Sequence, residues 1–263
     1  MLHRNNSLER GDRLMPQQRV IQGFEKAEKH TAKRLIISVE GLEKEGKTSF
    51  GLSAPGPIAL FDMDIGLEGV ISKWVDEKEI FVASFDYRDA TNQDEWLAMW
   101  MKMRAAYLTA LKDKAIRTLI WDTGTEAWEL IRLARFGQLA QVMPQHYGPV
   151  NAEFRDMIRK IYETDKNLIM LHKMKDEYVL VGDRKTGKSE RTGGHVRAGF
   201  SDVGYLMQMT LRVWRGEDRT FGLTVKDCRQ NAEIAGMDIS EPMNTFPFVA
   251  AEVFGDTSPE DWE

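Results

Sequence analysis

The motif that decides the fold is Gly41-Leu42-Glu43-Lys44-Glu45-Gly46-Lys47-Thr48, which matches the pattern G-x-x-x-x-G-K-S/T of a phosphate-binding loop. The apolar residues 35–39 (LIISV) precede it as an expected strand, and residues 48–52 follow it as the start of a short helix. Glycines let the backbone wrap closely around a triphosphate, so that N–H groups and the helix N-terminus face the anion. Lys47 can reach the β- and γ-phosphates, and the Thr48 hydroxyl can ligate Mg²⁺. The sequence therefore predicts a nucleotide-binding protein, with ATP as the expected nucleotide.

The predicted nucleotide contacts are the residues of this loop and the first residue after it. These residues are Gly41, Leu42, Glu43, Lys44, Glu45, Gly46, Lys47, Thr48 and Ser49. The same pattern occurs a second time at residues 182–189 (GDRKTGKS). Because residues 190–195 (ERTGGH) have no apolar periodicity that would form a phosphate-facing helix, we interpret the second match as a basic, glycine-rich loop.

Length and composition bound the class of protein. A chain of 263 residues suits one large α/β domain or two small ones, and no break in composition favours two. The apolar content of 42% and the charged content of 29% are typical of globular proteins. The single cysteine, Cys228, excludes an intrachain disulfide and fits a reducing compartment. No apolar stretch has the length of a membrane span, and the first residues do not form a signal peptide, so we expect a cytoplasmic protein.

Charge is distributed unevenly, although the net charge is only −5. Residues 252–263 contain five acids and no base, and we expect a disordered acidic tail there. Residues 182–199 are rich in bases, which are the predicted DNA-contacting residues: Arg184, Lys185, Lys188, Arg191 and Arg197. A basic loop on a neutral body can hold a nucleic-acid backbone. Charge alone favours the plainer alternative, a solvated loop.

Apolar patterns along the chain predict the order of elements. Further strands are expected at residues 58–62, 80–84, 117–122 and 167–172, and helices at 94–115, 126–136 and 152–164. Residues 177–199 are expected to form a polar hairpin and loop, and residues 210–215 and 221–226 an antiparallel pair. This order predicts an α/β P-loop NTPase with a mostly parallel sheet and antiparallel C-terminal edge strands. The predicted domains are an N-terminal arm (1–33), an ATPase domain (34–250) and a C-terminal tail (251–263).

Polar residues that close the apolar strands are the candidates for chemistry, because ligands of open α/β sheets bind at the carboxyl ends of the strands. Asp122 closes one strand, where it can hold Mg²⁺ together with Thr48, or else cap the following helix. Asp62 and Asp64 follow another strand and can orient or deprotonate the attacking water, or else be turn acids. His172 closes the last parallel strand and can bind the γ-phosphate, with a buried core histidine as the alternative.

This order of motifs resembles the RecA-like ATPase core. Residues 53–62 (SAPGPIALFD) more closely resemble the small phage-encoded ATPases of that group, which include single-strand annealing and recombination mediators. The resemblance covers residues 34–230. It implies that Asp64 stands where the family has its catalytic glutamate. If Asp64 proves dispensable, Glu68 is our alternative candidate for the base. The resemblance also implies that Asp122 belongs to the Mg²⁺ site and that His172 replaces the glutamine of the family's sensor strand.

The resemblance further implies contacts with neighbouring subunits and with DNA. Residues 225–229 (VKDCR) resemble the hairpin whose cations reach the ATP of a neighbouring subunit, which assigns this role to Lys226 and Arg229. The segment 182–199 stands where RecA-like proteins contact single-stranded DNA. Residues 24–27 (FEKA) match the F-x-x-A pattern by which such recombinases hook a neighbouring subunit.

The leading hypothesis is an oligomeric, DNA-stimulated ATPase, a ring or a filament, that acts on single-stranded DNA in phage-type recombination or replication. ATP and Mg²⁺ are the expected cofactors, and single-strand-binding or recombination proteins are expected partners, in the host cytoplasm if the protein is phage-encoded. The predicted catalytic residues are Lys47, Asp64, Asp122, His172, Lys226 and Arg229. The alternatives are a P-loop kinase of a nucleotide or small molecule, and a nucleotide-gated DNA-binding module with little turnover.

Overall fold

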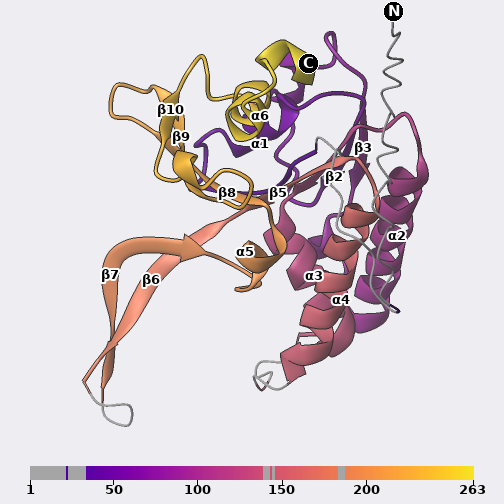
Figure 1. The fold of residues 1–263 in the computed structure, drawn as a ribbon. Helices are drawn as coiled ribbons and strands as arrows, with labels where there is room; N and C mark the ends of the chain where they lie inside the picture. Colours follow the sequence, from indigo (N-terminus) through magenta and orange to yellow (C-terminus); the bar gives the residue numbers. More distant parts are fainter. Residues whose placement is uncertain (1–21, 23–33, 139–142, 144–145, 183–186) are drawn as a thin grey trace, which may run out of the picture. The chain divides into compact units, whose positions relative to one another are not determined.

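An eight-stranded sheet carries most of the elements that the structure, a computed structural model, describes (Figure 1). The described residues are 22, 34–138, 143, 146–182 and 187–263. The strands follow the order β10 (Asp238–Ser240), β9 (Phe221–Cys228), β8 (Met209–Arg215), β1 (Ile36–Glu40), β5 (Asn167–His172), β4 (Thr118–Asp122), β2 (Ile58–Asp62) and β3 (Ile80–Ser84). Strands β8 to β3 are parallel, whereas β9 pairs antiparallel with β8 and β10 antiparallel with β9. The predicted α/β fold with an antiparallel C-terminal edge is confirmed.

The register of the central strands brings the polar strand ends together. Strand β5 lies between β1 and β4, and the pairs Glu40–His172 and Leu171–Asp122 are directly opposite each other. On the far side of β4, Asp62 pairs with Asp122. The carboxyl ends of β1, β5, β4 and β2 therefore meet at one edge of the sheet, as expected for a ligand site in an open α/β fold.

Helices cover both faces of the sheet, which explains why the central strands are apolar runs rather than alternating patterns. The helices are α1 (Lys47–Leu52), α2 (Gln93–Lys112), α3 (Gly124–Phe136), α4 (Tyr147–Lys160), α5 (Val203–Leu206) and α6 (Phe246–Phe254). One buried cluster joins the sheet to α2, α3 and α4, and a second joins the opposite face to α1 and α6 (Figure 1). Short 3₁₀ turns are η1 (Ile71–Lys73), η2 (Tyr87–Asp89), η4 (Ile161–Glu163), η5 (Ala232–Ile234) and η6 (Pro259–Trp262).

The C-terminal segment packs on the domain, where the sequence suggested a separate acidic tail from residue 251. Helix α6 continues to Phe254, and Trp262 in η6 is only 4% exposed. The Trp262 ring stacks on Phe254 with a centroid distance of 5.1 Å and meets the edge of Phe246 at 6.1 Å. The predicted boundary at residue 251 therefore lies inside α6. The acidic residues do not keep the segment apart from the domain, because Trp262 is buried against Phe246 and Phe254. The predicted arm lies outside the described residues except for Gln22, and so does the motif at residues 24–27.

A long hairpin forms a second, two-stranded sheet. It consists of β6 (Met174–Val181) and β7 (Lys188–Arg197), and Figure 1 shows it extending away from the end of β5. The expected polar hairpin thus exists, but it begins directly after β5 and carries four exposed apolar side chains, residues 178–181 (YVLV). Arg184 and Lys185 lie outside the described residues. Among the described helices, none is long and apolar enough to cross a membrane.

Candidate nucleotide-binding site

The loop between β1 and α1 has the backbone of a phosphate cradle. Lys44 and Gly46 have φ angles of 62° and 92°, in the left-handed region, and α1 begins at Lys47. A Cβ at Gly41 would lie 2.4 Å from Val213 Cγ2, so a glycine is required at the entry of the loop. At the exit, Gly46 lies against the Phe221 ring, 3.3 Å from where its Cβ would be. Both glycines of the motif are therefore explained by local geometry.

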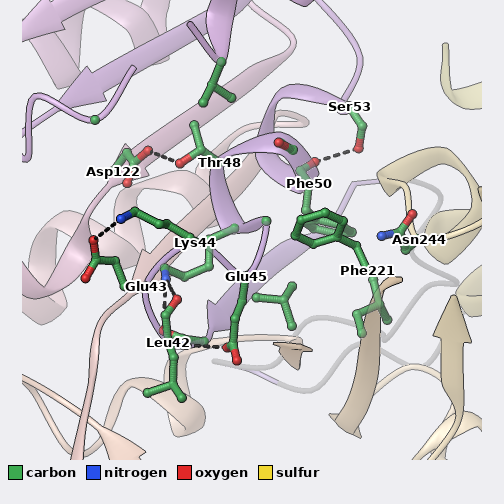
Figure 2. Close-up of a pocket in the computed structure, with 18 of the residues that line it drawn as sticks. Leu42, Glu43, Lys44, Glu45, Thr48, Phe50, Ser53, Asp122, Phe221 and Asn244 are labelled. Carbon is green, nitrogen blue, oxygen red and sulfur yellow. Dashed lines mark hydrogen bonds and ion pairs between the residues drawn. The ribbon is translucent and has the colours of Figure 1, made fainter. Parts of the chain in front are cut away.

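Lys47 folds back over this loop. Its Nζ atom donates hydrogen bonds to the carbonyl oxygens of Gly41 at 2.9 Å and of Leu42 at 2.5 Å. Burial lowers the pKa of Lys47, and the neighbouring Asp122 carboxylate opposes this shift. The Glu45 carboxylate accepts a hydrogen bond from Leu42 N across the loop (Figure 2). The ammonium group is thus held inside the cradle, where a triphosphate would replace the two carbonyl contacts.

Thr48 and Asp122 form the candidate magnesium site. The Thr48 hydroxyl donates to Asp122 Oδ2 at 2.7 Å (Figure 2). Burial raises the pKa of Asp122 to about 6, and the carboxylates of Asp62 and Asp64 add to this rise. Hydroxyl and carboxylate oxygens suit Mg²⁺, which usually takes few protein ligands and completes its shell with phosphate and water.

The helix-cap alternative for Asp122 does not hold, because its neighbour fills that position. Thr123 is the N-cap of α3, and its side chain accepts a hydrogen bond from Glu126 N at 3.2 Å. The Asp122 carboxylate instead accepts the hydrogen bond from Thr48 and lines the cavity.

The two acids after β2 take different positions. Asp62 is buried, and its Oδ1 atom accepts hydrogen bonds from Ile65 N at 3.0 Å and Asp64 N at 3.3 Å, so it is the turn acid of the pair. Asp64 lines the cavity, and its carboxylate accepts from Lys173 Nζ at 2.9 Å. Glu68 is exposed and does not line the cavity. The geometry therefore favours Asp64 as the acid that meets a nucleotide.

His172 is a buried core histidine. It is 1% exposed, neither ring nitrogen has a hydrogen-bond partner among the described residues, and the ring does not line the cavity. Burial, assisted by the charge of Arg197, lowers the pKa of His172 to about 3, so the ring is neutral near pH 7. Lys173 is the residue that lines the cavity instead, and the sequence analysis missed it. Its only signal was its place directly after an apolar strand.

The cavity extends from the phosphate loop towards the loop before α6, and its volume is about 1160 Å³. Besides the loop, the residues that line it include Trp74, Phe221, Asn244 and Thr245, and the Phe221 ring lies against Gly46. Figure 2 labels Phe50, Phe221 and Asn244 among the side chains that line this cavity. Ligand pockets of roughly 300–1,000 Å³ hold drug-sized molecules, so this space accommodates a nucleoside next to the triphosphate cradle.

The two cations of the predicted intersubunit hairpin lie at the opposite edge of the sheet. Strand β9 runs from Phe221, beside the phosphate loop, to Cys228, which pairs with Met209 at the start of β8. Lys226 is exposed, and Arg229 donates to the carbonyl oxygen of Tyr205 at 3.0 Å. Neither side chain lines the cavity of its own chain.

The described bases of the hairpin differ in their surroundings. Lys188 is exposed, and Arg191 is exposed but ion-paired with Asp176 on the facing strand. Arg197 is half-buried and donates to Ser38 Oγ of β1 at 3.1 Å. Arg197 therefore connects the base of the hairpin to the central sheet. Of the predicted DNA-contacting residues that the structure describes, Lys188 and Arg191 remain exposed to a phosphate backbone.

Comparison with known proteins identifies the family. Residues 33–213, more than half of the chain, match the family model described as an AAA domain. No curated protein matches the chain. The matched range begins before β1 and ends in β8, so it contains the phosphate loop, Asp64, Asp122, Lys173 and the whole hairpin.

Proposed function

Because the chain belongs to the AAA-domain family, whose members are P-loop ATPases that generally use ATP with Mg²⁺, we propose that it hydrolyses ATP and acts on single-stranded DNA in phage-type recombination or replication. One observation carries this proposal. Lys173 and Met174 both line the nucleotide cavity, and Met174 is already the first residue of the long hairpin. The nucleotide site and the candidate DNA-binding element are therefore directly connected along the chain.

The residues around the cavity suit phosphoryl transfer, which depends mainly on positioning and electrostatic stabilisation. Lys47 would bind the β- and γ-phosphates, and Thr48 and Asp122 would hold Mg²⁺, which would supply charge neutralisation for phosphoryl transfer. Asp64 positions the attacking water and accepts its proton. Asp64 lines the same cavity and is close enough for its charge to act on both Lys47 and Asp122.

The hairpin suits a flexible polyanion. Lys188 and Arg191 are exposed cations, and the sequence between Val181 and Lys188 contains two more bases, Arg184 and Lys185, which lie outside the described residues. Cations that replace the counterions of phosphates give affinity without sequence preference and with strong salt dependence. An isolated two-stranded hairpin is marginally stable in water. A bound partner that covers its exposed apolar side chains would therefore stabilise the hairpin.

Oligomerisation completes the proposal. Lys226 and Arg229 lie at the sheet edge opposite the phosphate loop, and this position supports a role in which they contact the nucleotide of a neighbouring subunit. A cation supplied in this way stabilises the charge of the transition state and couples hydrolysis to assembly. Single-strand-binding or recombination proteins are the partners that such an assembly would meet on DNA.

Binding of a fluorescent single-stranded oligonucleotide at several salt concentrations tests the proposed DNA contact. In the presence of a non-hydrolysable ATP analogue, Lys188→Ala plus Arg191→Ala should weaken binding at least tenfold. It should also flatten the logarithmic salt slope by roughly 1.4, since each phosphate contact contributes about 0.7 for single strands. The matched control is Lys102→Ala plus Arg104→Ala, which removes two exposed charges from α2. Equal affinity of all three proteins at every salt concentration would show that the hairpin is not the DNA contact.

A further inference from the structure

Lys173 occupies a junction between the nucleotide cavity and the hairpin. Its side chain is 37% exposed, and its ammonium group binds two carboxylates, Asp64 at 2.9 Å and Glu126 in a closer contact. Glu126 is held in turn by a short hydrogen bond from the Tyr87 hydroxyl. One cation therefore serves two acids, and only one of them, Asp64, faces the cavity where a triphosphate would bind.

The backbone of Lys173 joins the two ends of the hairpin. Its N–H group donates to Thr125 Oγ1 at 3.1 Å, and its carbonyl oxygen accepts from Ala198 N at 2.8 Å, directly after β7 ends. The Thr125 hydroxyl also contacts the Ala198 carbonyl oxygen at 3.4 Å. A displacement of Lys173 would therefore change hydrogen bonds at both ends of the hairpin and at the first turn of α3.

The charges around Lys173 are close to those that bind the phosphates. The ammonium group of Lys173 contributes to the lowering of the pKa of Lys47, and the Asp64 carboxylate acts in the opposite direction. Burial alone would lower the pKa of Lys173, but the contacts with Glu126 and Asp64 raise it above its usual value, so the side chain is cationic. A γ-phosphate carries more negative charge than one carboxylate and competes for this cation.

We propose that Lys173 distinguishes ATP from ADP by exchanging its contact with Asp64 for a contact with the γ-phosphate, while Glu126 keeps it tethered. This inference rests on the proposed function. The exchange frees Asp64 at the moment when a γ-phosphate is present. Hydrolysis then forms a bond between the water oxygen and the γ-phosphorus, breaks the bond to the bridging oxygen, whose electron pair stays on ADP, and passes the water proton to Asp64.

The exchange also gives the hairpin a means of sensing the nucleotide. With ADP, Lys173 holds Asp64, and the hairpin base has the geometry described above. With ATP, the side chain turns into the cavity, and the hydrogen bonds that Lys173 makes with Thr125 and Ala198 must adjust. The sequence suggested His172 as the residue that senses the γ-phosphate. Its ring is instead packed against the start of α3, where a Cβ at Gly124 would lie only 3.0 Å from it.

Calorimetric affinities for ADP and for a non-hydrolysable ATP analogue test this inference in wild type, Lys173→Met, Lys173→Arg and Lys175→Met. Loss of one charge-assisted contact reduces affinity by about tenfold or more. We expect Lys173→Met to lose at least tenfold in affinity for the analogue and less than twofold for ADP, and Lys173→Arg to retain most of the discrimination. The control Lys175→Met removes an exposed cation two residues along β6 and should match wild type.

Hydrogen exchange of residues 174–197 gives a second measurement. We expect wild-type protection of the hairpin to differ between the analogue and ADP, and we expect this difference to disappear in Lys173→Met. Equal losses for both nucleotides in Lys173→Met, an unchanged ratio, or identical wild-type protection would overturn the inference while leaving ATP hydrolysis intact. If the wild-type protein neither binds nor hydrolyses ATP, the proposed function fails and this inference falls with it.

Discussion

Asp122→Asn should make the nucleotide-free protein more stable at neutral pH. Burial raises the pKa of Asp122 from 3.8 to about 6, so the folded protein is destabilised when this carboxyl ionises. At about 1.4 kcal/mol per pKa unit, the ionisation costs roughly 3 kcal/mol. Asparagine keeps an oxygen that can accept the hydrogen bond from Thr48 but carries no charge. Below about pH 3 the carboxyl is largely protonated in both the folded and the unfolded state, and the advantage of the asparagine should vanish.

Urea unfolding in EDTA without nucleotide, at pH 4, 5, 6 and 7.5, measures this effect. The free energy of unfolding of Asp122→Asn should exceed that of wild type by roughly 2–3 kcal/mol at pH 7.5, with most of the difference appearing between pH 4 and 6. Asp76→Asn, at an exposed carboxylate, should stay within about 0.5 kcal/mol of wild type. A destabilised Asp122→Asn protein at pH 7.5, or a gain that does not change with pH, would refute the assigned burial and charge.

Three further outcomes follow from the site and the packing. Asp64→Asn should slow hydrolysis far more than it weakens ATP binding, whereas Asp122→Asn should impair both, as comparison of turnover and ATP affinity will show. Lys47→Ala subunits mixed with Arg229→Ala subunits should regain some hydrolysis at hybrid interfaces, and a mixture with no gain would argue against trans completion. Trp262→Ala should lower the free energy of unfolding by about 3–5 kcal/mol; a change below about 1 kcal/mol would mean that the C-terminal segment contributes little.

The fold and the centre of the site could be predicted because they depend on local patterns. An apolar run leading into the phosphate loop has few alternatives to a buried strand followed by a helix. The closeness of Thr48 and Asp122 then follows from topology alone, since parallel strands end at one edge of the sheet. The distinction between Asp62 and Asp64 did not follow, because both fit a turn and only the observed backbone shows which carboxylate accepts the turn hydrogen bonds.

Long-range contacts set the rest. Lys173 lies beside Asp64 only because β5 and β2 end at the same edge, 109 residues apart in sequence, and an isolated lysine gives no sign of such a pairing. The acidic composition of residues 251–263 suggested disorder, but the Trp262 ring packs against Phe246 and Phe254 of the preceding helix α6, and a composition count does not show this packing. In the same way, the positive charge of Arg197 suggested a DNA contact. In the structure its side chain donates a hydrogen bond to Ser38, 159 residues away in sequence.

ATP turnover with and without single-stranded DNA tests the central claim most directly, when wild type, Lys47→Ala and Lys188→Ala are measured side by side. Wild type should hydrolyse ATP and accelerate when DNA is added. Lys47→Ala should lose turnover under both conditions, because it removes the cation held in the phosphate cradle. Lys188→Ala, in the second copy of the motif, should keep its DNA-free rate. Full turnover by Lys47→Ala, or loss of DNA-free turnover in Lys188→Ala, would contradict the assignment of the site.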